Sequence, residues 1–252
     1  MHRFYLPPAQ CRDSQLTLSG QEAHHGLHVL RLRRGERVVV LDGAGGELLC
    51  EVGELARESI HLAVKQKNFL PALPYQLTLL QAIPKGKIIE TIIQKATELG
   101  AARVVPLLSE RVVMHLDDGA AEDKAAKWRL IAIEAIKQCG SAWLPQIEVP
   151  ITPKAFLARD EKFELPLIAS LQPGSHHPRE LFEAFYAEHR RLPQTVCVWV
   201  GPEGDFTPAE MSAAKSAGAL PISLGKLVLR SETAATYCLS VLNYELQASS
   251  AG

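Results

Sequence analysis

The sequence of 252 residues predicts an α/β protein, in which helices cover a parallel sheet, with a smaller all-β region in front of it. After residue 74, short apolar runs alternate with helical patterns, whereas the first seventy or so residues read as strands. Two prolines within residues 71–74 separate these regions and mark a linker. We therefore expect one domain over residues 1–70 and a second over residues 74–252.

The all-β region contains a clear hairpin. Apolar runs at residues 37–41 and 47–52 flank Asp-Gly-Ala-Gly-Gly at 42–46, a composition typical of a turn between antiparallel strands. A further alternating run covers residues 59–64. These three segments predict the strands of a small sheet.

The second region reads as strands alternating with helices. The predicted helices cover residues 87–99, with Gly100 at the capping position, and residues 120–139, with Gly140 after them. The short apolar runs predict buried parallel strands; they lie at residues 76–83, 104–108, 167–171, 196–200 and 220–224.

Composition excludes several classes of protein. Lys and Arg number 27 against 28 Asp and Glu. The resulting net charge of −1 excludes a surface that is basic overall, but it allows a local basic face. The five cysteines form no CxxC pair and their number is odd, which argues against a disulfide framework or a cysteine zinc site and favours buried thiols. No apolar run approaches the roughly 20 residues that span a bilayer, and the first residues carry no secretory signal. We therefore expect a cytoplasmic protein without a membrane segment.

Two glycine-rich segments are not nucleotide loops. Residues 43–46 are followed by a strand, where a dinucleotide fingerprint needs a helix. Pro-Lys-Gly-Lys at 84–87 resembles the end of a phosphate loop, but Gln81 stands where that loop needs glycine and no Ser or Thr follows the lysine. An ATPase is therefore disfavoured.

Two C-terminal motifs are more informative. Gly-Pro-Glu-Gly at 201–204 follows an apolar strand, and Thr207, Pro208 and Glu210 then carry the signature of a helix start. Residues 224–234 repeat this order of strand end, glycine, loop and helix start, with Arg230 at the helix mouth. Such loops occupy the carboxyl edge of a parallel sheet, where α/β proteins bind ligands. Alternatively, the first motif is a plain tight turn and the charges at 230 and 232 only solvate a helix end.

A cluster of histidines and arginines lies at residues 24–37, with only one acid among them. His24, His28 and Arg31 have helical spacing, so one face could carry them together. Metal binding would need carboxylate or cysteine partners that the sequence does not place nearby. A solvated basic surface and a phosphate-binding patch are the remaining interpretations, and paired guanidinium groups favour phosphate.

Taken together, these motifs resemble one family, the RsmE-type ribosomal RNA methyltransferases, along the chain from His2 to the last helix. Further segments of the resemblance lie at residues 90–100 and 109–111. The resemblance implies a SPOUT-type α/β domain with a C-terminal trefoil knot, preceded by a PUA-like β-barrel that binds RNA. It also implies a homodimer that uses S-adenosylmethionine and no metal to methylate N3 of a uridine in 16S ribosomal RNA, within the small ribosomal subunit.

The resemblance assigns site residues as well. It implies cofactor binding by Leu171, Gly201, Pro202, Glu203, Gly204, Leu224, Gly225, Leu227 and Leu229. Arg230 is the candidate that stabilises the anionic uracil, and Glu232 the candidate base, with Glu203 as an alternative. We expect RNA contacts from Arg3, His25, Arg31, Arg33, Arg34 and Arg111.

The chain departs from the family's pattern in two places. Asp205 stands where the family often has a second glycine. Ser-Ala-Trp at 141–143 follows Cys139-Gly140 where the family often has basic residues, which removes an expected phosphate contact. Two other classes remain open at this point: a catalytically silent RNA-binding protein, and a nucleotide-cofactor oxidoreductase that the missing glycine fingerprint disfavours.

Overall fold

A computed structural model describes residues 1–111 and 118–247, and the chain divides into two compact units. Unit 1 contains Met1–Ala72 and Ile133–Leu144, and unit 2 contains Leu73–Ala132 and Pro145–Gly252. The N-terminal unit thus includes a segment that the sequence boundaries leave out. This segment carries the end of the long helix α3 (Asp118–Cys139).

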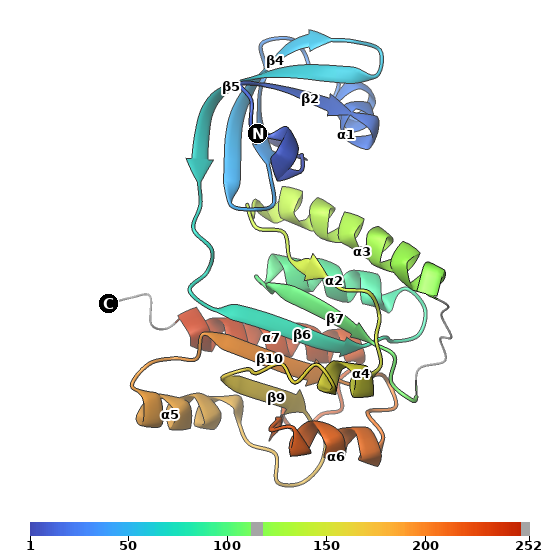
Figure 1. The fold of residues 1–252 in the computed structure, drawn as a ribbon, viewed down its shortest axis with the longest axis vertical. Coiled ribbons are helices and arrows are strands. Elements are labelled where there is room, and N and C mark those ends of the chain that lie inside the picture. The colour runs from blue at the N-terminus through green and yellow to red at the C-terminus, as the bar shows by residue number, and fades with distance from the viewer. Residues whose placement is uncertain (112–117, 248–252) are drawn as a thin grey trace. The chain divides into compact units, whose positions relative to one another are not determined.

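Unit 1 is a five-stranded sheet folded around one core (Figure 1). Its strands, in the order in which they pair, are β1 (His2–Tyr5), β3 (Arg37–Leu41), β4 (Gly46–Leu55), β5 (Ser59–Phe69) and β2 (Gln15–Ser19). The predicted hairpin is confirmed, because β3 and β4 pair antiparallel around residues 42–45. Register shifts in the β4–β5 pairing bend that ribbon, as β-bulges do.

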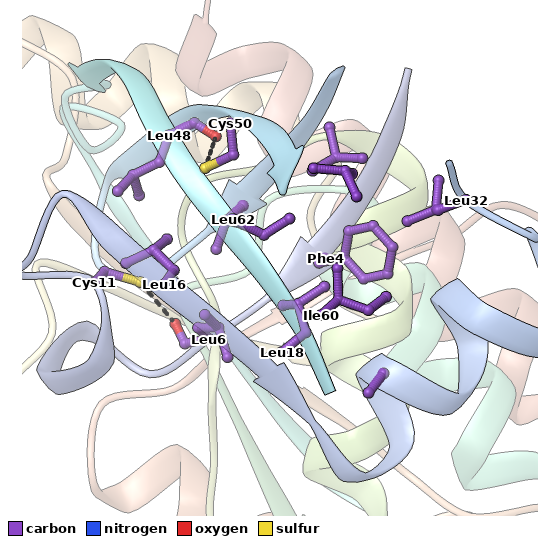
Figure 2. Packing of buried hydrophobic residues seen from close by; sticks show 14 residues of the cluster. Phe4, Leu6, Cys11, Leu16, Leu18, Leu32, Leu48, Cys50, Ile60 and Leu62 are labelled. Atoms are coloured by element: carbon purple, nitrogen blue, oxygen red, sulfur yellow. Dashed lines mark hydrogen bonds between the residues drawn. The ribbon is translucent and has the colours of Figure 1, made fainter. Parts of the chain in front are cut away.

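The core of unit 1 is built from alternate residues of these strands. Figure 2 shows Phe4, Leu18, Ile60 and Leu62 converging on it, and each of these side chains is fully buried. Gly26 lets the helical segment approach the sheet closely, because any side chain there would collide with Ile60: a Cβ would lie 2.5 Å from Ile60 Cδ1. The helical residues after β2 therefore sit directly on the sheet.

The helical segment after β2 is not the single helix with one shared face that the spacing of His24, His28 and Arg31 predicts. It consists of α1 (Gly20–His24) and the π-helical turn η2 (His25–Val29), and Arg31 lies beyond both with a left-handed φ of 54°. His24 and His28 do share a side, with ring centroids 4.8 Å apart. The expectation that Arg31 continues their helical face is wrong, because the backbone turns into the left-handed region at Arg31 itself.

Unit 2 is a six-stranded parallel sheet in the order β11-β9-β10-β6-β7-β8 (Figure 1). The strands are β6 (Gln76–Ala82), β7 (Arg103–Leu107), β8 (Gln146–Ile147), β9 (Leu165–Ala169), β10 (Thr195–Val200) and β11 (Leu220–Ile222). The predicted α/β class with a parallel sheet is confirmed. The trefoil knot stays a prediction.

Helices cover both faces of this sheet. The helices α4 (Pro153–Leu157) and α6 (Pro208–Ser216) pack on one face, in a cluster that includes Trp199. Alternate strand residues such as Leu79 and Val198 point to the other face and are fully buried too. The remaining helices are α2 (Ile88–Glu98), α5 (Pro178–His189) and α7 (Ser231–Gln247), of which α2 and α7 lie in contact.

The described residues include four buried cysteines and one exposed cysteine, Cys139. Burial raises the pKa of the Cys238 thiol to about 12, so this group stays protonated at neutral pH. None of the described helices combines the length and the apolar character that crossing a bilayer requires.

Candidate active site

The loops that follow three neighbouring strands meet at the carboxyl edge of the sheet in unit 2. β10 pairs with β9, and β9 pairs with β11, all in parallel, so the three strand ends lie side by side. Their loops and the first turn of α7 line one cavity. The lining residues are Ala169, Ser170, Leu171, Val200, Gly201, Pro202, Glu203, Asp205, Leu224, Gly225, Leu227, Val228, Leu229, Ser231 and Ala234.

The loop after β10 is folded tightly on itself. A Cβ at Gly201 would lie 2.9 Å from Asp205 Oδ1 and 3.2 Å from Asp205 Cα, so only glycine fits there. Asp205 has a left-handed φ of 61°, and its Oδ1 accepts a hydrogen bond from the Phe206 N–H at 2.8 Å. This conformation explains why glycine suits position 205 and why an Asp, which tolerates it, can replace glycine.

The helix after this loop begins as its sequence predicts. Thr207 Oγ1 accepts from the Glu210 N–H at 3.2 Å, and Glu210 Oε2 accepts from the Thr207 N–H at 2.9 Å. This reciprocal capping box, with Pro208 in the first turn, sets the position where α6 starts. The loop at 201–206 is therefore held at both ends, by β10 and by α6.

The loop after β11 presents apolar side chains to solvent. Leu227 and Val228 are 76% and 79% exposed, which is unusual for large aliphatic residues. Gly225 has a φ of 103°, and a Cβ there would meet nothing within 4 Å. The need for glycine at 225 is thus conformational, whereas at 201 it is steric.

A buried hydrogen-bond network joins these loops. Ser231 Oγ donates to the Gly201 carbonyl oxygen at 2.9 Å and accepts from Gln81 Nε2 at 3.0 Å. Gln81 is fully buried at the end of β6, and its Oε1 has no hydrogen-bond partner within the described chain. The glutamine that argued against a phosphate loop thus supports the floor of the site.

Charged groups hold the outer side of the loop at 201–204. Glu203 Oε1 accepts a hydrogen bond from the Lys85 N–H at 3.1 Å, and the Arg111 guanidinium donates to the Gly204 carbonyl oxygen. Arg230 is exposed between the lining residues Leu229 and Ser231, and Glu232 is half-buried in the first turn of α7. The site therefore combines bare backbone and carboxylates, with Arg111 and Arg230 beside it.

Eight of the nine predicted cofactor-binding residues line this cavity, and the ninth, Gly204, does not. The two catalytic candidates, Arg230 and Glu232, do not line it either. Leu171 and Leu224 lie two residues beyond the ends of β9 and β11, so the predicted strand ends at these residues are wrong. Sequence reasoning missed Ser170, Asp205, Val228 and Ser231 as lining residues. Ser231 lies within the recognised motif at 224–234, whereas Gln81 carried no signal beyond its place at a strand end.

The enclosed volume of the cavity is about 80 Å³. This volume is smaller than that of typical small-molecule sites, which is about 300–1,000 Å³. A larger cavity of about 430 Å³ lies elsewhere in unit 2, beside Phe156 and Trp199. That cavity contains neither of the glycine loops of the carboxyl edge.

In unit 1, the predicted RNA-binding residues fall into different settings. Arg31, Arg33 and Arg34 are exposed, whereas His25 is half-buried, with its ring 6.4 Å from that of Phe4. Arg3 Nη1 donates to the carbonyl oxygens of Lys137 and Gln138, at 3.2 and 3.1 Å, and so caps the C-terminus of α3. Arg111 belongs to unit 2 and contacts the loop at 201–204 of the candidate site.

The segment that lacks the expected basic residues is part of the packing of unit 1. Trp143 Nε1–H donates to the Leu70 carbonyl oxygen at 2.9 Å, and its ring meets Phe69 edge-on with centroids 6.0 Å apart. Ala142 is buried and accepts from the Gly45 N–H at 2.9 Å. The residues at 142–143 therefore stabilise the β3–β4 turn.

Two family models match this chain, with its parallel α/β fold and loop-lined cavity, to the RNA methyltransferases. Residues 71–243 match a family model described as an RNA methyltransferase domain, and residues 18–65 match one described as an RNA methyltransferase PUA domain. The predicted PUA-like region at the N-terminus is confirmed by the second match.

Curated relatives narrow the class. The chain is 35% identical over 248 residues to ribosomal RNA small subunit methyltransferase E of Synechocystis sp., covering 98% of this chain and 78% of that protein. It is 30% identical to the Bacillus subtilis protein of the same name, over 92% of this chain and 90% of that one. The chain belongs to the ribosomal RNA small subunit methyltransferase E family.

Solved structures of methyltransferases are similar to this chain over nearly its whole length. A putative methyltransferase of Legionella pneumophila, in complex with S-adenosylmethionine, is 31% identical, with a TM-score of 0.85 over 98% of this chain and 97% of that one. Ribosomal RNA small subunit methyltransferase E of Neisseria gonorrhoeae, bound to S-adenosyl methionine, is 27% identical, with a TM-score of 0.84 over 97% of both chains.

Proposed function

We propose that this protein transfers a methyl group from S-adenosylmethionine to N3 of one uridine in 16S ribosomal RNA. The observation that carries this proposal is the cavity formed by the loops after β9, β10 and β11, in a chain that belongs to a ribosomal RNA methyltransferase family. Unit 1 would bind the RNA and unit 2 would perform the transfer, with the boundary in the linker at residues 71–74.

The residues of the cavity suit S-adenosylmethionine. Gly201 and Gly225 line the cavity with backbone alone, so no side chain at these positions takes up space that a ligand needs. Leu227 and Leu229 offer apolar surface for an adenine ring. The carboxylates of Glu203 and Asp205 at the wall complement the positive charges of the ligand. When bound, the cofactor would supply a methyl group on a cationic sulfur.

The chain's own side chains would then handle the proton and the charge of the uracil. The N3 proton leaves readily only above neutral pH, so a positioned base is worth about 10²–10⁴ in rate. Glu232 is the candidate base, with Glu203 as the alternative; one oxygen of Glu203 already accepts the Lys85 N–H. The Arg230 guanidinium at the rim would stabilise negative charge on the uracil carbonyl oxygens.

The wider setting is also part of the proposal. Action on ribosomal RNA within the small subunit would place the protein in the cytoplasm. We further propose a homodimer, which the exposed Tyr237 and Tyr244 on α7 support, because large exposed apolar side chains favour association. Light scattering of the purified protein measures this directly.

The experiment that tests the activity uses small subunits from a strain lacking the modification. Incubation with S-adenosylmethionine should produce N3-methyluridine at one position, detected by mass spectrometry of the ribosomal RNA digest. Naked 16S ribosomal RNA serves as the second substrate. Binding of S-adenosylmethionine without methyl transfer to either substrate would contradict the proposal.

The two other classes give different results in a titration. A catalytically silent RNA-binding protein would bind RNA and no S-adenosylmethionine. An oxidoreductase would bind NADH in preference to S-adenosylmethionine. Calorimetry with both cofactors therefore separates the three functions.

A further inference from the structure

Unit 1 contains a cavity of about 370 Å³ that the active site does not use. Its volume lies within the range of sites that hold small molecules or single groups of a larger ligand, about 300–1,000 Å³. Its lining residues come from the β2–α1 junction, the following helical turns and the β4–β5 hairpin. They are Ser19, Gly20, His24, Leu27, His28, Arg57 and Glu58.

The register of the sheet brings these segments together. Ser19, the last residue of β2, pairs with Ser59 at the start of β5, so α1 begins beside the β4–β5 hairpin (Figure 1). The Ala56 N–H donates to the Ser59 carbonyl oxygen at 3.0 Å, which closes the turn and leaves residues 57 and 58 at its tip. Gly26 allows the helical segment to sit close to Ile60. The cavity is therefore built by backbone pairing.

One wall is made of two imidazole rings. The rings of His24 and His28 are 4.8 Å apart at their centroids and tilted by 47°, and both residues are exposed. Leu27 between them adds apolar surface to the same cavity. Unpaired bases of RNA stack on aromatic side chains, histidine included, so this wall suits a base.

The tip of the β4–β5 hairpin carries two opposite charges, Arg57 and Glu58. Within residues 1–111 and 118–247, the side chains of Arg57 and Glu58 make no hydrogen bond or ion pair, although adjacent in sequence. A guanidinium binds phosphate with two parallel hydrogen bonds. A carboxylate accepts two N–H groups at once, and among the four bases guanine presents two neighbouring donors, N1–H and the 2-amino group, on one edge.

A metal ion is a poorer occupant of this cavity. Although two histidines and one glutamate line it, the described residues contain no group of three His, Cys, Asp or Glu side chains placed to hold a metal ion. Uracil is a poorer base as well, because its single N–H lies between two carbonyl oxygens that Glu58 would repel. The cavity therefore differs in chemistry from the site that receives the target uridine.

We infer that this cavity holds an unpaired guanine nucleotide of the RNA, with the base against His24 and His28, its donor edge on Glu58 and a phosphate on Arg57. The inference rests on the proposed binding of RNA by unit 1, and it gives that binding a base preference. The enzyme would thus recognise its substrate partly through a guanine separate from the methylated uridine.

The test measures binding of the full-length protein to fluorescent RNA heptamers by anisotropy. The probes are UUUGUUU, UUUIUUU with inosine at the centre, and UUUUUUU. We expect the guanine heptamer to bind about tenfold more tightly than the uridine heptamer, the discrimination typical of a good two-bond base contact, with inosine between them. Equal affinities, or no measurable binding of any heptamer, would overturn the inference.

Three variants locate the preference. Glu58→Gln should abolish the guanine preference, because the amide replaces one of the two acceptor oxygens with an NH₂ donor that faces a donor of guanine. Its matched control is Glu54→Gln, an exposed acid of the same hairpin outside the cavity, which should retain the preference. His28→Ala should weaken all three heptamers alike through lost stacking. A loss in Glu54→Gln equal to that in Glu58→Gln would overturn the assignment.

Calorimetry with S-adenosylmethionine on the same protein keeps the two proposals distinguishable. If the cofactor fails to bind while the guanine preference persists, methyl transfer is refuted and the guanine site remains. If the cofactor binds and methylation proceeds while the heptamers bind equally, the guanine site is refuted and the proposed function remains. Unchanged thermal unfolding shows that each variant is folded.

Discussion

Ser231 and Gln81, 150 residues apart in sequence, are joined by a buried hydrogen bond of 3.0 Å between Oγ and Nε2. Because Ser231 Oγ also donates to the Gly201 carbonyl oxygen, one hydroxyl connects the end of β6, the loop after β10 and the start of α7. These two bonds position the inner wall of the proposed cofactor site.

Replacing that hydroxyl should loosen the site. Ser231→Ala removes both bonds and leaves buried polar groups unsatisfied, which costs about 1–3 kcal/mol in the free energy of unfolding. We expect a lower urea midpoint together with weaker S-adenosylmethionine binding in calorimetry. Ser216→Ala, at an exposed position of α6, is the control and should change neither quantity. Cofactor affinity equal to that of the wild type would show that Ser231 does not position the loop.

The steric requirement at Gly201 predicts a difference between two neighbouring glycines. Gly201→Ala places a Cβ 2.9 Å from Asp205 Oδ1, so the loop must open and cofactor affinity should fall about tenfold or more. Gly204→Ala is the matched control, because the nearest atom to its Cβ would be Arg111 Cδ at 3.4 Å. Gly201→Val should weaken binding further while the fold survives. Isothermal titration of the three variants measures the effect, and equal affinities for both alanine variants would contradict it.

Arg230 should matter for turnover and little for stability. Its side chain is exposed and forms no hydrogen bond or ion pair within the described residues. Arg230→Ala should therefore leave the melting temperature within a few degrees, while methyl transfer falls by about two orders of magnitude through lost stabilisation of the uracil anion. Arg230→Lys retains the charge and should recover part of the rate. Near-normal methylation by the alanine variant would reduce Arg230 to a surface residue.

The arginines of unit 1 should separate into RNA contacts and structural contacts. Replacing the exposed Arg31 and Arg33 with Ala should weaken RNA binding and reduce the salt dependence of the affinity, because fewer counterions are released. Cofactor affinity should stay unchanged. Anisotropy at several salt concentrations measures the slope, and an unchanged slope would place the RNA surface elsewhere.

Arg3→Ala is the informative comparison for that double variant. Arg3 caps the last turn of α3 through two carbonyl oxygens, so its loss should lower the stability of unit 1. The RNA contact expected at Arg3 stays a prediction, and the same titration tests it. If Arg3→Ala lowers the salt slope without lowering the melting temperature, Arg3 contacts phosphate and its capping role is minor.

Local patterns predicted much of this protein because their physical causes are local. The capping box at Thr207 and Glu210 depends on residues three apart, and the β3–β4 hairpin depends on its own turn. Apolar runs identified the strands of the parallel sheet, and the two glycine loops identified the edge where the site lies. The ends of β9 and β11 were misplaced by two residues, because Leu171 and Leu224 continue the apolar pattern after the pairing stops.

By itself, the sequence determined the α/β class, the all-β region before it, the family resemblance and the loops that line the cavity. The tertiary structure alone decided the partners of polar side chains that are far apart in the chain. Arg3 bonds to carbonyl oxygens 134 and 135 positions away, Ser231 bonds to Gln81, and the hairpin tip at Arg57 and Glu58 meets the two histidines. Such partners depend on strand order and register, which arise from the packing of the whole core. A periodic pattern in the sequence therefore does not predict which residues they are.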